Sequence, residues 1–208
     1  MSEIVLVRHG QTEWSANGRH TSFTDLELTP AGERQAHALG AALAGRTIAT
    51  VVSSPRTRAM QTAVLAGLEV STVDDELAEW HYGDYEGLTT AEIVATRPDW
   101  NLWLDGCPGG ETPDQVGARL DRVLARVRAH LAVGDVVLVG HGHALRVAGA
   151  RWIGLPPSGG GCLRLDTATL STLGFEHARE VILSWNAPVP TAAAGPRTAS
   201  TAQPSSAS

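Results

Sequence analysis

The chain has 208 residues and a formal net charge of -6, and 43% of its residues are hydrophobic. This size and composition suit one ordinary globular domain, and the acidic balance argues against a general nucleic-acid or anionic-membrane surface, which needs a basic face. All 16 basic residues are arginine, which excludes mechanisms that need a lysine amine, such as a Schiff base.

The first predicted element is a buried strand over Ile4–Val7, which ends on Arg8-His9-Gly10. Its uninterrupted apolar run is typical of a parallel strand covered on both faces. Ligands of open α/β sheets bind at the carboxyl ends of the strands. Arg8 and His9 are therefore candidates for chemistry.

The other predicted elements alternate between helices and strands. In chain order they are a turn-rich loop over 11–28, a helix from Thr29-Pro30 to Gly45, a strand over 50–53, a helix to about Ala66, a strand candidate over 70–73, an acidic and aromatic loop over 75–87, a mixed helical and aromatic segment over 89–104, a helix from Thr112, a strand over 135–139, a helix from about Ala144 to Ile153, a Pro/Gly turn over 156–161, and two late strands, roughly over 163–173 and 180–185. This order predicts an α/β fold with three layers, α/β/α, and a mostly parallel central sheet.

The chain ends in a segment of different composition. From Ala187 onward it is rich in Pro, Ala, Ser and Thr, with one arginine as its only charge. Such a segment cannot bury an apolar face. We therefore expect a catalytic domain over 1–186 and a disordered tail over 187–208.

The start and the two cysteines indicate the cellular compartment. Met1-Ser2-Glu3 provides no basic region, and the apolar run that follows is too short for a signal peptide or a membrane span. Cys107 and Cys162 form neither a disulfide framework nor a zinc spacing. We therefore expect a cytoplasmic protein with no membrane partner.

A second His-Gly pair ends the predicted strand over 135–139. If this strand neighbours the first, His9 and His141 meet at one pocket floor. Arg8 and Arg58 are each expected at a strand end beside this pocket. Together with the two histidines they give it four nitrogen-bearing side chains, which suits a phosphate group. Gly142 lets the backbone approach and offers a free N–H.

Four separated segments strengthen this hypothesis. They are Arg8-His9-Gly10-Gln11-Thr12-Glu13-Trp14, residues 54–59, residues 79–87 and Gly140-His141-Gly142. In this order they resemble the motifs of the histidine phosphatase superfamily, also called the phosphoglycerate mutase-like family, over nearly all of residues 3–186. Within the family, the chain looks most like acid phosphatases and sedoheptulose-bisphosphatase-like sugar phosphatases, which implies a phosphoglycerate mutase-like fold.

The resemblance implies roles for five side chains. His9 is implied to be the nucleophile that forms a phosphohistidine, and Glu79 to be the general acid. Arg8, Arg58 and His141 are implied to hold the phosphoryl oxygens. An imidazole attacks phosphorus only when neutral, and flanking guanidinium groups keep it neutral by lowering its pKa.

Further substrate contacts are expected around these groups. Thr21 and Ser22 lie in the loop after the nucleophile, and we expect them to contact the part of the substrate that is not transferred. Tyr82 and Glu111 are expected at the pocket rim. Ser15 stands where many family members have Asn, so we expect its phosphate contact to be shorter, water-bridged or lost. Asn17 suits a substitute for this contact and a simple turn residue equally well.

The sequence favours a phosphatase over two alternatives. Bisphosphoglycerate-dependent mutases of the family carry a lysine where this chain has Thr90, and an arginine pair in an insert that here, over 87–111, holds only Arg97. A catalytically inactive phospho-ligand binder would lack the nucleophile, an arginine or the acid, and all are present. We predict hydrolysis of small phosphomonoesters such as sugar phosphates.

No metal and no cofactor are predicted. His143 forms His-x-His with His141, but no third ligand has a convincing spacing, so a position behind the site or at a helix N-terminus is favoured over zinc. A second substrate phosphate would need Arg19, Arg97 or Arg146. The expected partner is a small phosphorylated molecule and not nucleic acid, and the oligomeric state is left open, with a homodimer among the options.

Overall fold

A six-stranded sheet forms the centre of the computed structural model, which describes residues 2–190. The strands are β1 (Ile4–Arg8), β2 (Ile48–Ser53), β3 (Thr72–Val73), β4 (Asp135–Gly140), β5 (Thr169–Glu176) and β6 (Arg179–Pro188). Their order in the sheet is β3-β2-β4-β1-β5-β6. β3, β2, β4 and β1 pair in parallel, and β5 pairs antiparallel with β1 on one side and with β6 on the other. The predicted α/β class with a mostly parallel sheet is confirmed.

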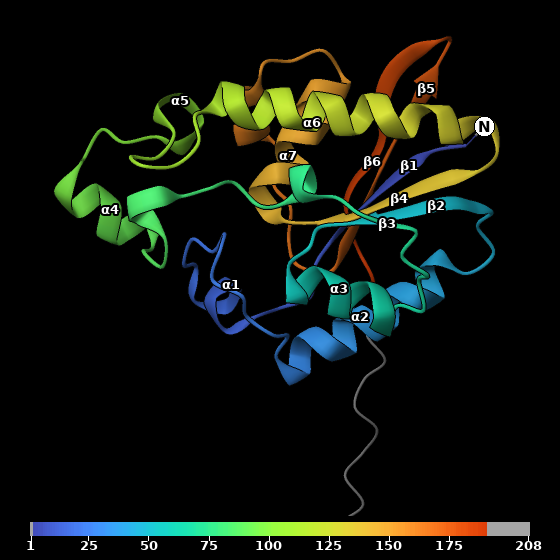
Figure 1. Cartoon of the computed structure of the whole chain (residues 1–208), viewed down its shortest axis with the longest axis horizontal. Helices are drawn as coiled ribbons and strands as arrows, with labels where there is room; N and C mark the ends of the chain where they lie inside the picture. The colour runs from blue at the N-terminus through green and yellow to red at the C-terminus, as the bar shows by residue number, and fades with distance from the viewer. Residues whose placement is uncertain (1, 191–208) are drawn as a thin grey trace, which may run out of the picture.

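Helices cover both faces of this sheet, as Figure 1 shows. Helices α2 (Pro30–Leu43) and α3 (Thr57–Leu65) lie on one face, and α6 (Pro113–Val127) and α7 (Gly142–Trp152) lie on the other. Successive strand residues point to opposite faces. Val5 and Val7 therefore join one hydrophobic cluster with α2 and α3, while Ile4 and Leu6 join the other with α6 and α7.

Threonine caps begin several helices where the sequence predicted them. The Thr29 side chain accepts a hydrogen bond from the Gly32 N–H at the start of α2, and Thr112 accepts one from Gln115 at the start of α6. A proline in the first turn follows each cap, with its φ already suited to a helix.

Some boundaries differ from the prediction. The loop over 11–28 contains a short helix α1 (Glu13–Asn17), and the mixed segment over 89–104 forms two helices, α4 (Thr90–Thr96) and α5 (Leu102–Asp105). Residues 163–168 are not strand, because β5 begins only at Thr169, where pairing with β1 and β6 starts. Apolar patterning alone does not show where a strand finds its partner.

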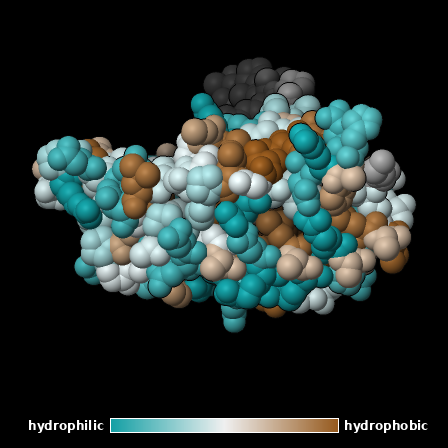
Figure 2. All heavy atoms as spheres, turned by 90° about the horizontal axis from the view of Figure 1, so that it is seen from above, coloured by the Kyte–Doolittle hydropathy of each residue, from teal (hydrophilic) through white to brown (hydrophobic). Residues whose placement is uncertain are grey.

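The surface is mixed in character. Figure 2 shows hydrophobic residues in several patches that hydrophilic residues separate. No helix within residues 2–190 is long and apolar enough to cross a membrane. Ala187 and Pro188, which the prediction placed in the tail, pair with Leu170 and Thr169 at the end of β6. The predicted tail from residue 191 onward lies outside the described residues.

Candidate active site

A small cavity opens at the carboxyl ends of β1 and β4, with a volume of about 90 Å³. Its lining consists of Arg8, His9, Thr12, Ser15, Thr21, Glu79, Tyr82, Gly142, His143, Arg146 and Leu165. Sites for drug-sized ligands measure roughly 300–1,000 Å³. The enclosed part of this site therefore suits a group as small as a phosphoryl group, with the rest of a ligand lying outside it.

His9 presents one ring nitrogen to this cavity. Its Nδ1 lies 2.7 Å from the Gly10 carbonyl oxygen, which is only an acceptor, so Nδ1 carries the proton and donates it. In a neutral imidazole the other nitrogen, Nε2, then holds the lone pair. The local backbone thus selects the tautomer that a nucleophilic Nε2 requires.

The surroundings of His9 keep its ring neutral. Burial lowers the pKa of His9 well below 6.5, and the positive charges of Arg58 and Arg8 lower this pKa further. The hydrogen bond to Gly10 opposes these effects but does not reverse them. The sequence predicted that the two arginines lower this pKa. They do, but burial lowers it more than either of them.

Arg8 offers a donor without a protein partner. One of its terminal nitrogens donates to the Leu165 carbonyl oxygen, while its Nε is buried and has no hydrogen-bond partner. A Cβ at Gly142 would come within 3.2 Å of the Arg8 guanidinium carbon. Glycine therefore lets this guanidinium lie against the first turn of α7.

Arg58 and His141 lie beside the cavity but are not part of its lining. The Arg58 Nε donates to the His141 Nδ1 at 3.2 Å, so the other nitrogen, Nε2, carries the proton and donates it to the Ser54 hydroxyl at 2.7 Å. The remaining Arg58 nitrogens donate to the carbonyl oxygens of Thr21, Ser22 and Thr24. The ring centroids of His9 and His141 are 5.2 Å apart, so the predicted meeting of the two histidines is observed.

Glu79 lies across the start of α7. One carboxylate oxygen accepts hydrogen bonds from the backbone N–H groups of Trp80 and Ala144, at 2.9 and 2.8 Å, and the other from the N–H of His143 at 3.1 Å. These donors include N–H groups that a helix start leaves without intrahelical partners. Glu79 is thus held at the cavity wall by the same helix that follows His141.

Tyr82 and His143 form a neutral pair in the wall of the cavity. Burial raises the pKa of the Tyr82 phenol and lowers the pKa of His143, and the Tyr82 hydroxyl and the His143 Nδ1 are hydrogen-bonded at 2.6 Å. Trp103 packs edge-on against His143, and the Arg146 guanidinium lies 4.4 Å over the Trp103 ring. Of the three arginines considered for a second phosphate, Arg146 is the one that lines the cavity.

The loop after His9 contributes Thr12, Ser15 and Thr21 to the lining, but not Ser22. The backbone N–H and hydroxyl of Ser22 are held by the Glu86 carboxylate. Ser15 completes a capping box: its hydroxyl accepts from the Thr12 N–H at 2.8 Å and donates to the Thr12 carbonyl oxygen. The hydroxyl at the family's Asn position is therefore already used to begin α1.

Four lining residues were not predicted as site residues. Thr12 lies within the first motif but was assigned no role, Leu165 lies in no motif, His143 is predicted behind the site or at a helix N-terminus, and Arg146 is a candidate only for a second phosphate. Leu165 enters through its carbonyl bond to Arg8, across 157 positions of chain, which no local pattern reveals. Glu111, expected at the rim, lies outside the lining of this cavity.

No group of three or more His, Cys, Asp or Glu side chains within residues 2–190 is placed to hold a metal ion.

Known proteins resemble this chain along most of its length. Residues 4–188 match the family model described as histidine phosphatase superfamily (branch 1). The chain is 45% identical over 176 residues to an acid phosphatase of Mycobacterium tuberculosis, covering 84% of this chain and 87% of the relative. It is 43% identical over 182 residues to sedoheptulose 1,7-bisphosphatase of Saccharomyces cerevisiae, covering 73% and 67% of the two chains.

Solved structures agree with this likeness. The structure of an open reading frame from Mycobacterium tuberculosis has a TM-score of 0.88 at 41% identity, covering 91% of this chain and 99% of the other. A mycobacterial glucosyl-3-phosphoglycerate phosphatase complexed with VO3 has a TM-score of 0.80 at 33% identity, covering 90% and 100%.

Proposed function

The chain belongs to the histidine phosphatase superfamily and is an enzyme that acts on phosphate esters, and from this premise we propose that it hydrolyses small phosphomonoesters through a phosphohistidine on His9. The neutral His9 ring at the cavity is the observation that carries the proposal, because its protonated Nδ1 leaves the lone pair on Nε2. The buried, unpartnered Nε of Arg8 supplies an adjacent donor for a phosphoryl oxygen.

The first step transfers the phosphoryl group to the enzyme. The Nε2 lone pair of His9 forms a bond to phosphorus while the bond to the leaving oxygen breaks, and the Glu79 carboxyl gives its proton to that oxygen. The phosphorylated ring gains positive charge, which the Gly10 carbonyl oxygen stabilises through Nδ1–H. Arg8 stabilises the negative charge on the phosphoryl oxygens.

The second step releases phosphate. The Glu79 carboxylate takes a proton from a water molecule, whose oxygen bonds to phosphorus while the bond from phosphorus to Nε2 breaks. The products are inorganic phosphate and neutral His9, and Glu79 regains its proton. Arg58 and His141 are proposed to support this chemistry, although their nitrogens bond to protein groups in the structure described.

Hydrolysis is preferred to a mutase reaction because of two sequence features. Thr90 occupies the position at which the mutases of the family carry a lysine. The insert over 87–111 has Arg97 as its only arginine, and Arg97 pairs with Asp105 at 3.8 Å and does not line the cavity. Relatives named as an acid phosphatase and a sedoheptulose bisphosphatase support a phosphorylated metabolite as substrate. Relatives named as probable phosphoglycerate mutases, at 31% identity, keep the mutase as the second candidate.

A substrate panel tests this proposal. The wild-type enzyme is incubated in chelator with sugar phosphates and 3-phosphoglycerate, and free phosphate and positional isomers are followed together. We expect phosphate release without isomerisation, and none from His9→Ala. Isomerisation faster than phosphate release would identify a mutase, absence of turnover would identify a phospho-ligand binder, and loss of turnover on chelation would contradict metal independence.

A further inference from the structure

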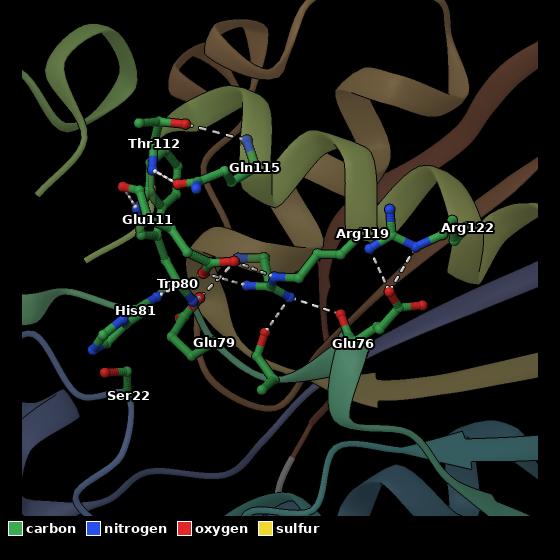
Figure 3. A network of polar contacts seen from close by, with 12 residues as sticks. Ser22, Glu76, Glu79, Trp80, His81, Glu111, Thr112, Gln115, Arg119 and Arg122 are labelled. Atoms are coloured by element: carbon green, nitrogen blue, oxygen red, sulfur yellow. Dashed lines mark hydrogen bonds and ion pairs between the residues drawn. The ribbon is translucent and has the colours of Figure 1, made fainter. Parts of the chain in front are cut away.

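We propose that Glu111 and Arg119 are positioning residues that hold Glu79 in place for proton transfer, an inference that rests on the proposed role of Glu79 as the general acid. Neither side chain lines the catalytic cavity. They lie behind Glu79, where Figure 3 shows them bonded to one another and to the backbone around it.

Glu111 holds the chain just after Glu79. One of its carboxylate oxygens accepts a hydrogen bond from the His81 N–H at 2.8 Å, and its backbone N–H donates to the His81 carbonyl oxygen at 2.9 Å. Its own carbonyl oxygen accepts from the indole N–H of Trp80 at 3.0 Å. The two residues that follow Glu79 are thus paired with Glu111 by three hydrogen bonds.

Arg119 holds the chain just before Glu79. From α6, one of its terminal nitrogens donates to the carbonyl oxygens of Glu76 and Ala78, each at 2.7 Å. Its Nε and its other terminal nitrogen donate to the two carboxylate oxygens of Glu111, at 2.7 and 3.0 Å. The planar guanidinium group therefore bonds to the backbone before Glu79 and, through Glu111, to the backbone after it. A lysine ammonium group cannot reproduce this set of hydrogen bonds.

Burial makes this arrangement rigid. The Arg119 side chain is 11% exposed and that of Glu111 is 20% exposed, so water competes weakly for their hydrogen bonds. Arg122, one turn later on α6, also bonds to Glu76, but its side chain is 58% exposed. Arg119 and Arg122, two of the three arginines of α6, differ in what they hold: Arg119 holds the backbone beside Glu79, and Arg122 holds the Glu76 carboxylate.

Positioning matters most where the leaving group needs a proton. A displacement of about 1 Å can reduce a rate by roughly 10²-fold, and a general acid contributes about 10²–10⁴-fold. Alkyl phosphates need protonation of the leaving oxygen, whereas aryl phosphates with acidic phenols leave almost without it. A displaced Glu79 therefore lowers the alkyl rate more than the aryl rate.

The test is the ratio of kcat/KM for an aryl phosphate to that for an alkyl phosphate. Arg119→Lys keeps the positive charge but loses the planar guanidinium donors. Glu111→Gln keeps the shape of the side chain but loses its negative charge. We expect each to raise the ratio about tenfold, and Glu79→Gln to raise it about 10²-fold or more. Arg122→Lys is the matched control and should leave the ratio unchanged. Both rates come from one preparation, so the folded fraction cancels.

The outcomes separate the inference from the function on which it rests. An unchanged ratio in Arg119→Lys and Glu111→Gln, with a raised ratio in Glu79→Gln, overturns the positioning role alone. An unchanged ratio in Glu79→Gln overturns the general acid itself. A ratio raised equally in Arg122→Lys would show that any disturbance of α6 has this effect, and would also overturn the inference.

Discussion

The ends of β1 and β4 invite comparison, because they are neighbouring parallel strands with nearly the same sequence. Val7 pairs with Val139 and Arg8 with Gly140, and a His-Gly pair follows at or just after the end of each strand. The first histidine keeps a ring nitrogen for the cavity, whereas both ring nitrogens of the second are bonded to protein side chains.

The difference comes from the partners that the fold supplies. The His9 proton goes to the carbonyl of the next residue, whereas His141 is bonded to Ser54, just after β2, and to Arg58, in the first turn of α3. Burial lowers the pKa of both histidines, so both are neutral. Similar local sequence thus gives one side chain suited to attack and one suited to support.

His9→Ala tests this asymmetry with the largest expected effect. Loss of the nucleophile should lower kcat by at least about 10⁴-fold, because no other lining residue presents a free imidazole lone pair on the same strand end. Phosphate release measures this loss, and the phosphoenzyme is trapped by an alkaline denaturing quench, because the P–N bond of a phosphohistidine breaks in acid. Appreciable turnover, or a phosphoenzyme in the variant, would contradict the assignment.

His141→Ala should cost less, about 10²–10³-fold in kcat. The change removes a neutral ring beside His9 and leaves the Arg58 Nε without its partner. The phosphoenzyme should still form, more slowly, and rapid-quench kinetics would measure its formation. A loss equal to that of His9→Ala would remove the distinction between the two histidines.

The pH profile sharpens the comparison further. Because the pKa of His9 lies well below 6.5 and the neutral form attacks, the acid limb of kcat/KM should lie below pH 6.5. Burial is the main cause and Arg58 the next, so Arg58→Gln should raise this pKa and move the limb upward in pH. Thermal unfolding would confirm that the variant folds, and a limb that stays in place would exclude Arg58 as a cause.

Ser54→Ala should have the smallest effect, a loss of less than about tenfold in kcat. It removes the acceptor for the His141 Nε2–H but leaves the bond from Arg58, so the ring keeps one of its two anchors. Steady-state kinetics beside His141→Ala would measure the difference. A loss as large as that of His141→Ala would show that Ser54 acts directly on the substrate.

The sequence alone determined the fold class and the group of strand-end residues. Uninterrupted apolar runs predict strands covered on both faces, and threonine caps followed by proline predict helix starts, because these are properties of neighbouring residues. The expected meeting of His9 and His141 followed from the rule that parallel strands end at one edge. The motif around Glu79 indicated its place in the same site.

Only the tertiary structure decided how these residues are used. Several of the contacts that decide it join segments distant in the chain. They are the hydrogen bond from Arg8 to Leu165, the hydrogen bond from His141 to Ser54, and the contacts that Arg119 and Glu111 make on either side of Glu79. Ser22 and Ser15 show the same limit, since the first is held by Glu86 and the second by its own helix cap. Hydrogen-bond partners depend on distances that folding sets, and sequence spacing does not contain them.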